Sequence, residues 1–148
     1  MHLLQIEVES DEFIPARQHM SDVGYDLMAN IEDEVVVAPN TRMVIGTGVK
    51  IQLPEGYEAS IRPRSGLATK HGIMLVNSPG TIDSGYRGEI KVILYNSDTK
   101  PFTINRFDRI AQMVLNKVEL PTLVVGKVNE SDRGEKGLGS TGLKKGEI

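Results

Sequence analysis

The chain has 148 residues, a hydrophobic fraction of 39%, a charged fraction of 25% and a formal net charge of −3. This length is typical of one domain that buries enough apolar surface to fold without covalent cross-links. The absence of cysteine excludes disulfides and thiolate metal sites. The sequence contains neither a basic tract for duplex nucleic acid nor an apolar run long enough for a signal peptide or membrane span. It therefore predicts a soluble, cytoplasmic protein.

Most of the chain is predicted to form short β-strands. Leu4, Ile6 and Val8 alternate with polar residues, which is the pattern of a half-buried strand. Further candidate strands, each closed by turn residues, cover residues 35–37, 49–53, 90–95 and 110–118. This pattern predicts an all-β sandwich or barrel.

One short helix is expected at residues 65–71. Ser65 is expected to act as its N-cap, and Gly72 stands where a glycine commonly ends a helix. Arg62 and Arg64 lie beside the expected helix start, where free N–H groups favour an anion that Arg64 can bind with two hydrogen bonds. A solvated charged turn explains the same residues equally well.

Residues 80–89 are predicted to form a β-hairpin. Asp83 ends its first strand, Ser84-Gly85 supply the turn, and Glu89 begins the second strand. Asp83 beside a turn is usually a turn former, although a carboxylate there can also orient and deprotonate a water. Tyr86 is either a packing residue or the rigid wall of a pocket.

Asp22 and Asp26 stand four residues apart around a glycine. Carboxylates here can reach a magnesium ion through water, since that ion usually keeps several water ligands. A solvated loop is the commoner explanation of such a pattern. The three histidines have no zinc-ligand spacing, and no G-x-S-x-G segment indicates a serine nucleophile.

The last 20 residues differ in composition, with five glycines, eight charged residues and only three large apolar side chains. Such a segment cannot offset its ordering entropy by burial, so the sequence predicts a β-domain at 1–128 and a flexible arm at 129–148. Residues 137–142 match the G-x-G-x-x-G pattern, but without the strand and helix that a dinucleotide site needs. A glycine-rich backbone with Arg133 can still bind phosphate, although composition alone favours a disordered tail.

The order of these segments is more informative than any one of them. From about Asp22 to Gly142, the segments VGYDL, PRSGLATKHGI, NSPGTIDSGYRGE, RIAQM and RGEKGLGSTG resemble, in the same order, the five motifs of the trimeric deoxyuridine triphosphatases (dUTPases). The second and third segments match almost residue for residue. By this resemblance, which covers most of its length, the chain is identified as a member of the family.

The resemblance implies a jelly-roll-like β-domain that assembles as a homotrimer, with active sites shared between subunits and closed by the C-terminal arm. It implies Mg2+-dependent hydrolysis of dUTP to dUMP and pyrophosphate, which limits uracil incorporation into DNA and supplies dUMP for thymidylate synthesis. Neither a nucleic acid nor a membrane is expected as a partner.

The resemblance also implies roles for individual residues. Asp83 would activate the attacking water, Gln112 would offset developing charge on the phosphates, and Asp26 would support Mg2+ through water. Phosphate contacts are expected from Arg64, Ser65, Gly66, Gln112, Arg133, Gly139, Ser140 and Thr141. Base and sugar contacts are expected from Asn77, Gly80, Thr81, Ile82, Asp83, Tyr86, Lys91 and Leu138.

Two positions in the arm depart from the family pattern. Lys136 replaces a glycine, and Leu138 replaces the aromatic residue that covers uracil, so we expect weaker arm closure but not loss of activity. Three alternatives stay open at this point: a dCTP deaminase of the same fold, a nucleotide-sensing regulatory protein, and a structural jelly-roll subunit. The segment IDSGYRGE favours the hydrolase.

Overall fold

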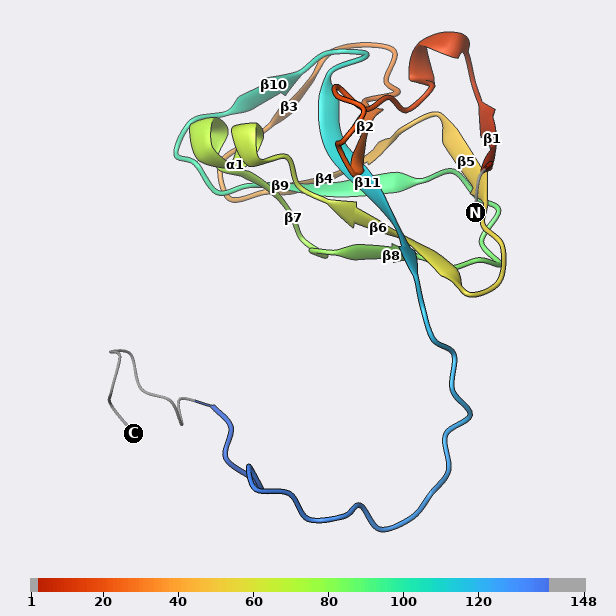
Figure 1. The fold of residues 1–148 in the computed structure, drawn as a ribbon. Coiled ribbons are helices and arrows are strands. Elements are labelled where there is room, and N and C mark those ends of the chain that lie inside the picture. Colours follow the sequence, from red (N-terminus) through yellow and green to blue (C-terminus); the bar gives the residue numbers. More distant parts are fainter. Residues whose placement is uncertain (1–2, 139–148) are drawn as a thin grey trace.

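The computed structural model of the chain describes residues 3–138, and strands form most of its regular structure (Figure 1). The strands are β1 (Gln5–Val8), β2 (Gly24–Met28), β3 (Val35–Val37), β4 (Arg42–Gly46), β5 (Val49–Gln52), β6 (Tyr57–Arg62), β7 (Ile73–Leu75), β8 (Gly80–Ile82), β9 (Lys91–Asn96), β10 (Phe102–Ile104) and β11 (Arg109–Lys117). A 3-10 helix, η1 (Asp11–Phe13), follows β1, and the helix α1 (Ser65–His71) follows β6. The predicted all-β fold with one short α-helix is confirmed.

All strand pairs are antiparallel, and several join strands that are distant in the sequence. The larger sheet has the order β2-β11-β6-β8 and the smaller sheet has the order β4-β9-β7. Two ribbons, β1-β5 and β10-β3, complete the domain. This strand order is consistent with the jelly-roll-like arrangement that the resemblance implied.

A hydrophobic core lies between the two sheets. Val92 and Leu94 of β9 point into it from the smaller sheet, and Ala59 and Ile61 of β6 from the larger one. In β5 and β9, the period-2 alternation of the sequence thus separates the core face from the outer face. The expected half-burial of β1 is not seen at Ile6, which stays 36% exposed because β1 pairs only with β5.

Of the two predicted ends of α1, only the C-terminal end is confirmed. The N-cap is Arg64, with extended backbone, and Ser65 is already helical, so the prediction that Ser65 caps the helix is wrong. A residue with helical backbone no longer directs its side chain at the free N–H groups of the first turn. Gly72 ends the helix as predicted, in the left-handed conformation (φ 61°, ψ 20°), with its N–H donating to Ala68.

Residues 80–89 do not form the predicted β-hairpin. Ser84-Gly85 make the expected turn, in which the Tyr86 N–H donates to the Asp83 carbonyl at 3.1 Å. However, β8 pairs with β6, whereas β9 begins only at Lys91 and pairs with β4 and β7. The two strands therefore find their partners in different sheets, a choice that the turn residues do not encode.

Beyond β11 the chain leaves the domain as an extended segment (Figure 1). Residues 118–138 contain neither strand nor helix, and Leu123, Val125 and Val128 are almost fully exposed. The predicted boundary at residue 128 stays a prediction. In the part of the chain that the structure describes, no helix has the length and apolar character that crossing a membrane requires.

Asn96 holds the loop that follows β9. Its buried amide donates to the carbonyls of Val37 (2.9 Å) and Lys100 (2.8 Å) and accepts from the N–H of Asp98 (2.9 Å). We expect Asn96→Ala to lower the free energy of unfolding by about 2–4 kcal/mol, because buried backbone groups lose their partners. Urea denaturation at one protein concentration measures the change. The exposed Thr103→Ala serves as control at less than about 0.5 kcal/mol, and equal values for both variants would contradict this role of Asn96.

Candidate active site

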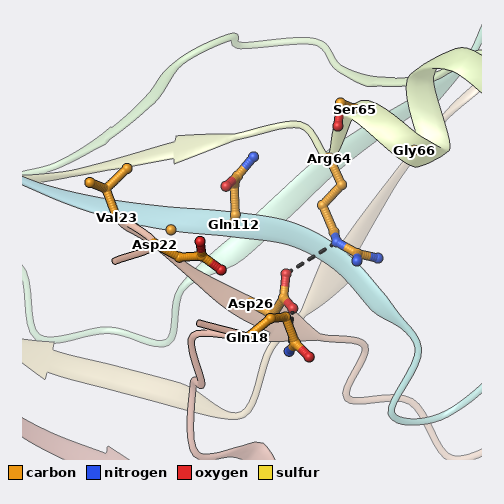
Figure 2. Close-up of a pocket in the computed structure, with 9 residues that line it drawn as sticks. Gln18, Asp22, Val23, Asp26, Arg64, Ser65, Gly66 and Gln112 are labelled. Atoms are coloured by element: carbon orange, nitrogen blue, oxygen red, sulfur yellow. Dashed lines mark hydrogen bonds and ion pairs between the residues drawn. The ribbon is translucent and has the colours of Figure 1, made fainter. Parts of the chain in front are cut away.

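A pocket of about 340 Å³ opens on the larger sheet (Figure 2). Three segments that are distant in the sequence form it: β2 with the loop before it, the connection from β6 to α1, and β11. Its lining residues are Gln18, Asp22, Val23, Gly24, Asp26, Arg64, Ser65, Gly66 and Gln112. The pocket thus brings together the predicted phosphate-binding residues of the folded domain and the predicted metal-supporting aspartate.

The central position of β11 brings these segments together. Gln112 stands opposite Asp26 of β2 and opposite Arg62 of β6. Residues directly opposite each other on antiparallel strands share one face of the sheet. Gln112 and Asp26 therefore face the pocket together, and β6 continues through Pro63 into the turn that carries Arg64 (Figure 2).

Asp26 is bonded through both carboxylate oxygens and is 8% exposed. Its Oδ1 pairs with Nε of Arg64 at 3.1 Å, and its Oδ2 accepts from Nη1 of Arg109 at 3.1 Å and from Nε2 of Gln18 at 3.0 Å. Arg64 is held a second time, because its Nη1 donates to the backbone carbonyl of Arg109 at 3.0 Å. Charge-assisted contacts of this kind fix the orientation of a guanidinium group.

Gln112 lies directly against Gly24. Its Nε2 donates to the carbonyl of Pro63 at 3.0 Å. A Cβ atom at position 24 would overlap the Oε1 of Gln112. Glycine therefore provides the space in which the Gln112 amide faces the pocket.

The predicted base and sugar contacts from the folded domain lie outside this pocket. They are Asn77, Gly80, Thr81, Ile82, Asp83, Tyr86 and Lys91. Asp83 is exposed, and within residues 3–138 its carboxylate has no hydrogen-bond or ion-pair partner. Tyr86 donates its hydroxyl to the Glu89 carbonyl at 2.9 Å, and its ring covers Gly88.

Strand register separates Asp83 from the pocket along β6, although Gly80 pairs with Ile61, directly before Arg62. Ile82 pairs with Ala59, whereas Gln112 of the pocket pairs with Arg62. The strand between Ala59 and Arg62 is about 10 Å long at ~3.3 Å per residue. Asp83 follows Ile82 and lies beyond that distance. Within a single chain, Asp83 therefore lies apart from the pocket.

The described part of the arm contributes to neither group. Arg133 donates its Nε to the carbonyl of Lys136 at 3.0 Å, and the Leu138 side chain is fully exposed. Gly139, Ser140 and Thr141 lie outside the described residues. Their phosphate contacts stay predictions.

Comparison with known proteins agrees with this arrangement of motifs. Residues 11–142 match the family model described as dUTPase. The chain belongs to the dUTPase family. A deoxyuridine 5′-triphosphate nucleotidohydrolase of Caldanaerobacter subterraneus subsp. tengcongensis is 46% identical and is covered over 97% of both chains. One of Chlamydia pneumoniae is 49% identical over 92% of this chain and 95% of its own.

Solved dUTPase structures share the fold. A mutant dUTPase of Staphylococcus bacteriophage 80alpha with dUpNHpp superposes with a TM-score of 0.87 at 28% identity, over 97% of this chain and 100% of that one. A mutant dUTPase of phage phi11, whose structure describes the coordination of a structural Mg(II) ion, gives 0.77 at 27% identity over 87% and 99%. The predicted jelly-roll-like dUTPase fold is confirmed.

The pocket of this dUTPase-family chain fits a magnesium ion only through water. No group of three or more metal-ligating side chains occurs among residues 3–138. Both oxygens of Asp26 already accept hydrogen bonds, and Asp22 accepts from the N–H of His19 at 2.9 Å. A carboxylate engaged in this way can still accept a hydrogen bond from a water molecule that is bound to a magnesium ion.

Two side chains that bind Asp26, those of Gln18 and Arg109, were not predicted from the sequence. Arg109 has a recognisable signal, since it is the first residue of the matched segment RIAQM, although no role was assigned to it. Gln18 has none, because it reaches Asp26 from a loop that folds back over eight residues. A contact of that kind depends on the loop conformation and not on strand register.

We expect Gly24→Ala to move Gln112 away from the Pro63 carbonyl, since the new methyl group needs the space of its Oε1. The free energy of unfolding should fall by about 1 kcal/mol, the usual value of one lost hydrogen bond. In a protein that already carries Gln112→Ala, Gly24→Ala should leave the free energy of unfolding almost unchanged. Urea denaturation of the four proteins measures this coupling, and equal costs in both backgrounds would rule out the contact.

Proposed function

We propose that this chain is a dUTP diphosphatase, which hydrolyses dUTP to dUMP and pyrophosphate in the cytoplasm. The reaction limits uracil incorporation into DNA and supplies dUMP for thymidylate synthesis. The observation that carries the proposal is the pocket around Arg64 and Gln112, in a chain that matches the dUTPase family model over residues 11–142. Curated relatives that match nearly the whole chain are named deoxyuridine 5′-triphosphate nucleotidohydrolase.

The pocket binds the phosphate chain of the nucleotide. Within the protein, Arg64 uses Nε and Nη1, which leaves the two N–H groups of its Nη2 for phosphate oxygens. The backbone at Gly66 is open to a ligand, because an added Cβ there would meet no atom within 4 Å. The Ser65 hydroxyl and the second N–H of the Gln112 amide complete the donors and offset charge that develops on the leaving phosphates.

A magnesium ion accompanies the triphosphate. The charged groups that line the pocket are two carboxylates, of Asp22 and Asp26, and one guanidinium, of Arg64. Such a lining does not by itself neutralise a triphosphate, and Mg2+ bound to the phosphate oxygens supplies the missing positive charge. Asp26 supports this ion through a water ligand.

Uracil and deoxyribose bind at the segment that contains β8. Backbone groups at Asn77, Ile82 and Lys91 read the uracil edge, and the close fit leaves no room for the methyl group of thymine. Cytosine would present the wrong donors and leave buried groups unpaired. Tyr86, 43% exposed and held by its hydroxyl on Glu89, packs under the sugar and rejects a 2′-hydroxyl.

Asp83 acts as the general base. Its carboxylate takes a proton from a water whose oxygen attacks the α-phosphorus in line, and the bond to the bridging oxygen breaks to release pyrophosphate. An exposed carboxylate without an intramolecular partner in the described chain is suited to hold such a water.

The complete site forms in a homotrimer, in which the pocket of one subunit meets the Asp83 turn of another. The separation of Asp83 from the pocket along β6 supports this assembly. The outer face of the smaller sheet exposes Val44 (59%), Met74 (43%) and Val76 (53%), an apolar surface that a neighbouring subunit can cover. The arm at 129–148 then brings Arg133, Gly139, Ser140 and Thr141 to the β- and γ-phosphates.

Each alternative function predicts a different assay result. A dCTP deaminase would release ammonia from dCTP, and a nucleotide-sensing protein would bind dUTP tightly without turnover. A structural subunit would have no nucleotide affinity. Pyrophosphate release from dUTP with Mg2+ present supports the diphosphatase, and its absence overturns it.

We expect Asp83→Asn to retain binding of a non-hydrolysable dUTP analogue while turnover falls by about 10²–10⁴-fold, the usual contribution of a general base. Pyrophosphate release measures turnover, and calorimetry measures binding. Asp33→Asn removes one exposed carboxylate elsewhere and should leave both unchanged. Turnover of Asp83→Asn near the wild-type rate would refute the role of Asp83.

Leu138→Phe tests whether the arm covers the base. Leu138 is fully exposed in the nucleotide-free chain, and a phenylalanine can stack on uracil once the arm closes. We expect about two- to tenfold tighter binding of the dUTP analogue, as for an aromatic pair worth ~0.5–1.5 kcal/mol. Leu123→Phe, at an exposed position outside the motif, should change nothing. Unchanged affinity in Leu138→Phe would mean that residue 138 does not contact uracil.

A further inference from the structure

Arg109 contacts two residues that line the pocket, Asp26 and Arg64, but does not line the pocket itself. Its Nη1 donates to Oδ2 of Asp26 at 3.1 Å, and its backbone carbonyl accepts from Nη1 of Arg64 at 3.0 Å. The Arg109 side chain is 42% exposed, and the pocket is lined without it. Arg109 therefore lies behind the groups that meet the ligand.

The charges of Asp26, Arg64 and Arg109 show what the second arginine adds to the group. Asp26 carries one negative charge and pairs with Arg64 at 3.1 Å, so the pair alone has no net charge with which to attract an anion. The guanidinium of Arg109 pairs with the other oxygen of Asp26 and restores one net positive charge to the group. Removing it would leave Arg64 largely neutralised by a carboxylate that is only 8% exposed.

The local backbone directs Arg109 to this position. The strand pairing of β11 with β2 is irregular between Arg109 and Ala111, and such a bulge re-aims a side chain. The preceding turn is held by Arg106, whose guanidinium lies over the rings of Phe13 (5.4 Å) and Phe107 (5.1 Å). Arg109, the first residue of β11, thus directly follows a turn whose position is held by the ring contacts of Arg106.

We propose that Arg109 is a positioning residue for phosphate binding: it neutralises Asp26 and orients Arg64, so that the charge and the Nη2 edge of Arg64 remain available to the triphosphate. This inference rests on the proposed function, because it takes the pocket as the phosphate site. It assigns no contact between Arg109 and the nucleotide.

Binding of a non-hydrolysable dUTP analogue, of dUDP and of dUMP to full-length protein tests the inference, with Mg2+ and again in EDTA. We expect Arg109→Gln to weaken analogue binding by about tenfold, or ~1.4 kcal/mol. The loss should grow from dUMP to dUDP to the analogue and should be present in EDTA. Arg109→Lys, which keeps the charge, should lose less. Lys117→Gln removes one exposed charge from the same strand and should bind as wild type.

A double-mutant cycle with Asp26→Asn separates positioning from direct contact. Once Asp26 is neutral there is no charge to offset, so Arg109→Gln should then add little further loss. An equal loss in both backgrounds, or a loss no larger than that of Lys117→Gln, overturns the inference. If Arg109→Gln does not fold, as thermal melting reveals, Arg109→Lys takes its place in the same cycle. Wild-type protein that neither binds the analogue nor hydrolyses dUTP refutes the proposed function itself.

Discussion

The pairing of β11 with two strands at once is the constraint on which the pocket depends. β11 lies between β2 and β6, so Gln112 faces Asp26 on one side and Arg62 on the other. Segments that are more than 80 residues apart in the chain meet there, through the pairing of β11 with β2 and through side-chain contacts such as that of Arg109 with Asp26. Ala111 and Met113, the neighbours of Gln112 in β11, are buried in the core, and Gln112 is thereby directed outward.

Asp26 links this register to the chemistry of the pocket. A carboxylate that is 8% exposed is costly to bury unless donors surround it, and here Gln18, Arg64 and Arg109 provide them. Because the two guanidinium groups remain partly exposed, at 26% and 42%, their own desolvation is incomplete. The cluster of Asp26, Arg64 and Arg109 therefore carries one net positive charge, and each member depends on the others.

The sequence identifies local chemistry better than strand partners. The left-handed Gly72 and the Ser84-Gly85 turn could be predicted because each depends only on nearby residues. The predicted hairpin at 80–89 was wrong, because β8 pairs with β6, whose paired residues lie 19 to 23 positions upstream. The motif order pointed to the pocket residues, whereas Gln18 and Arg109 reach Asp26 only through a folded loop and a bulge.

The same strand pairing that assembles the pocket around Arg64 and Gln112 keeps Asp83, the proposed general base, away from it. β8 adds to the far edge of the sheet at Ala59, so Asp83 and the ring of Tyr86 face solvent at the end of β6 remote from Arg64. The proposed phosphate site and the proposed general base thus lie apart on one domain. Bringing Asp83 to the pocket within one chain would require breaking the β6 pairing that both need, whereas the proposed assembly from two chains preserves that pairing.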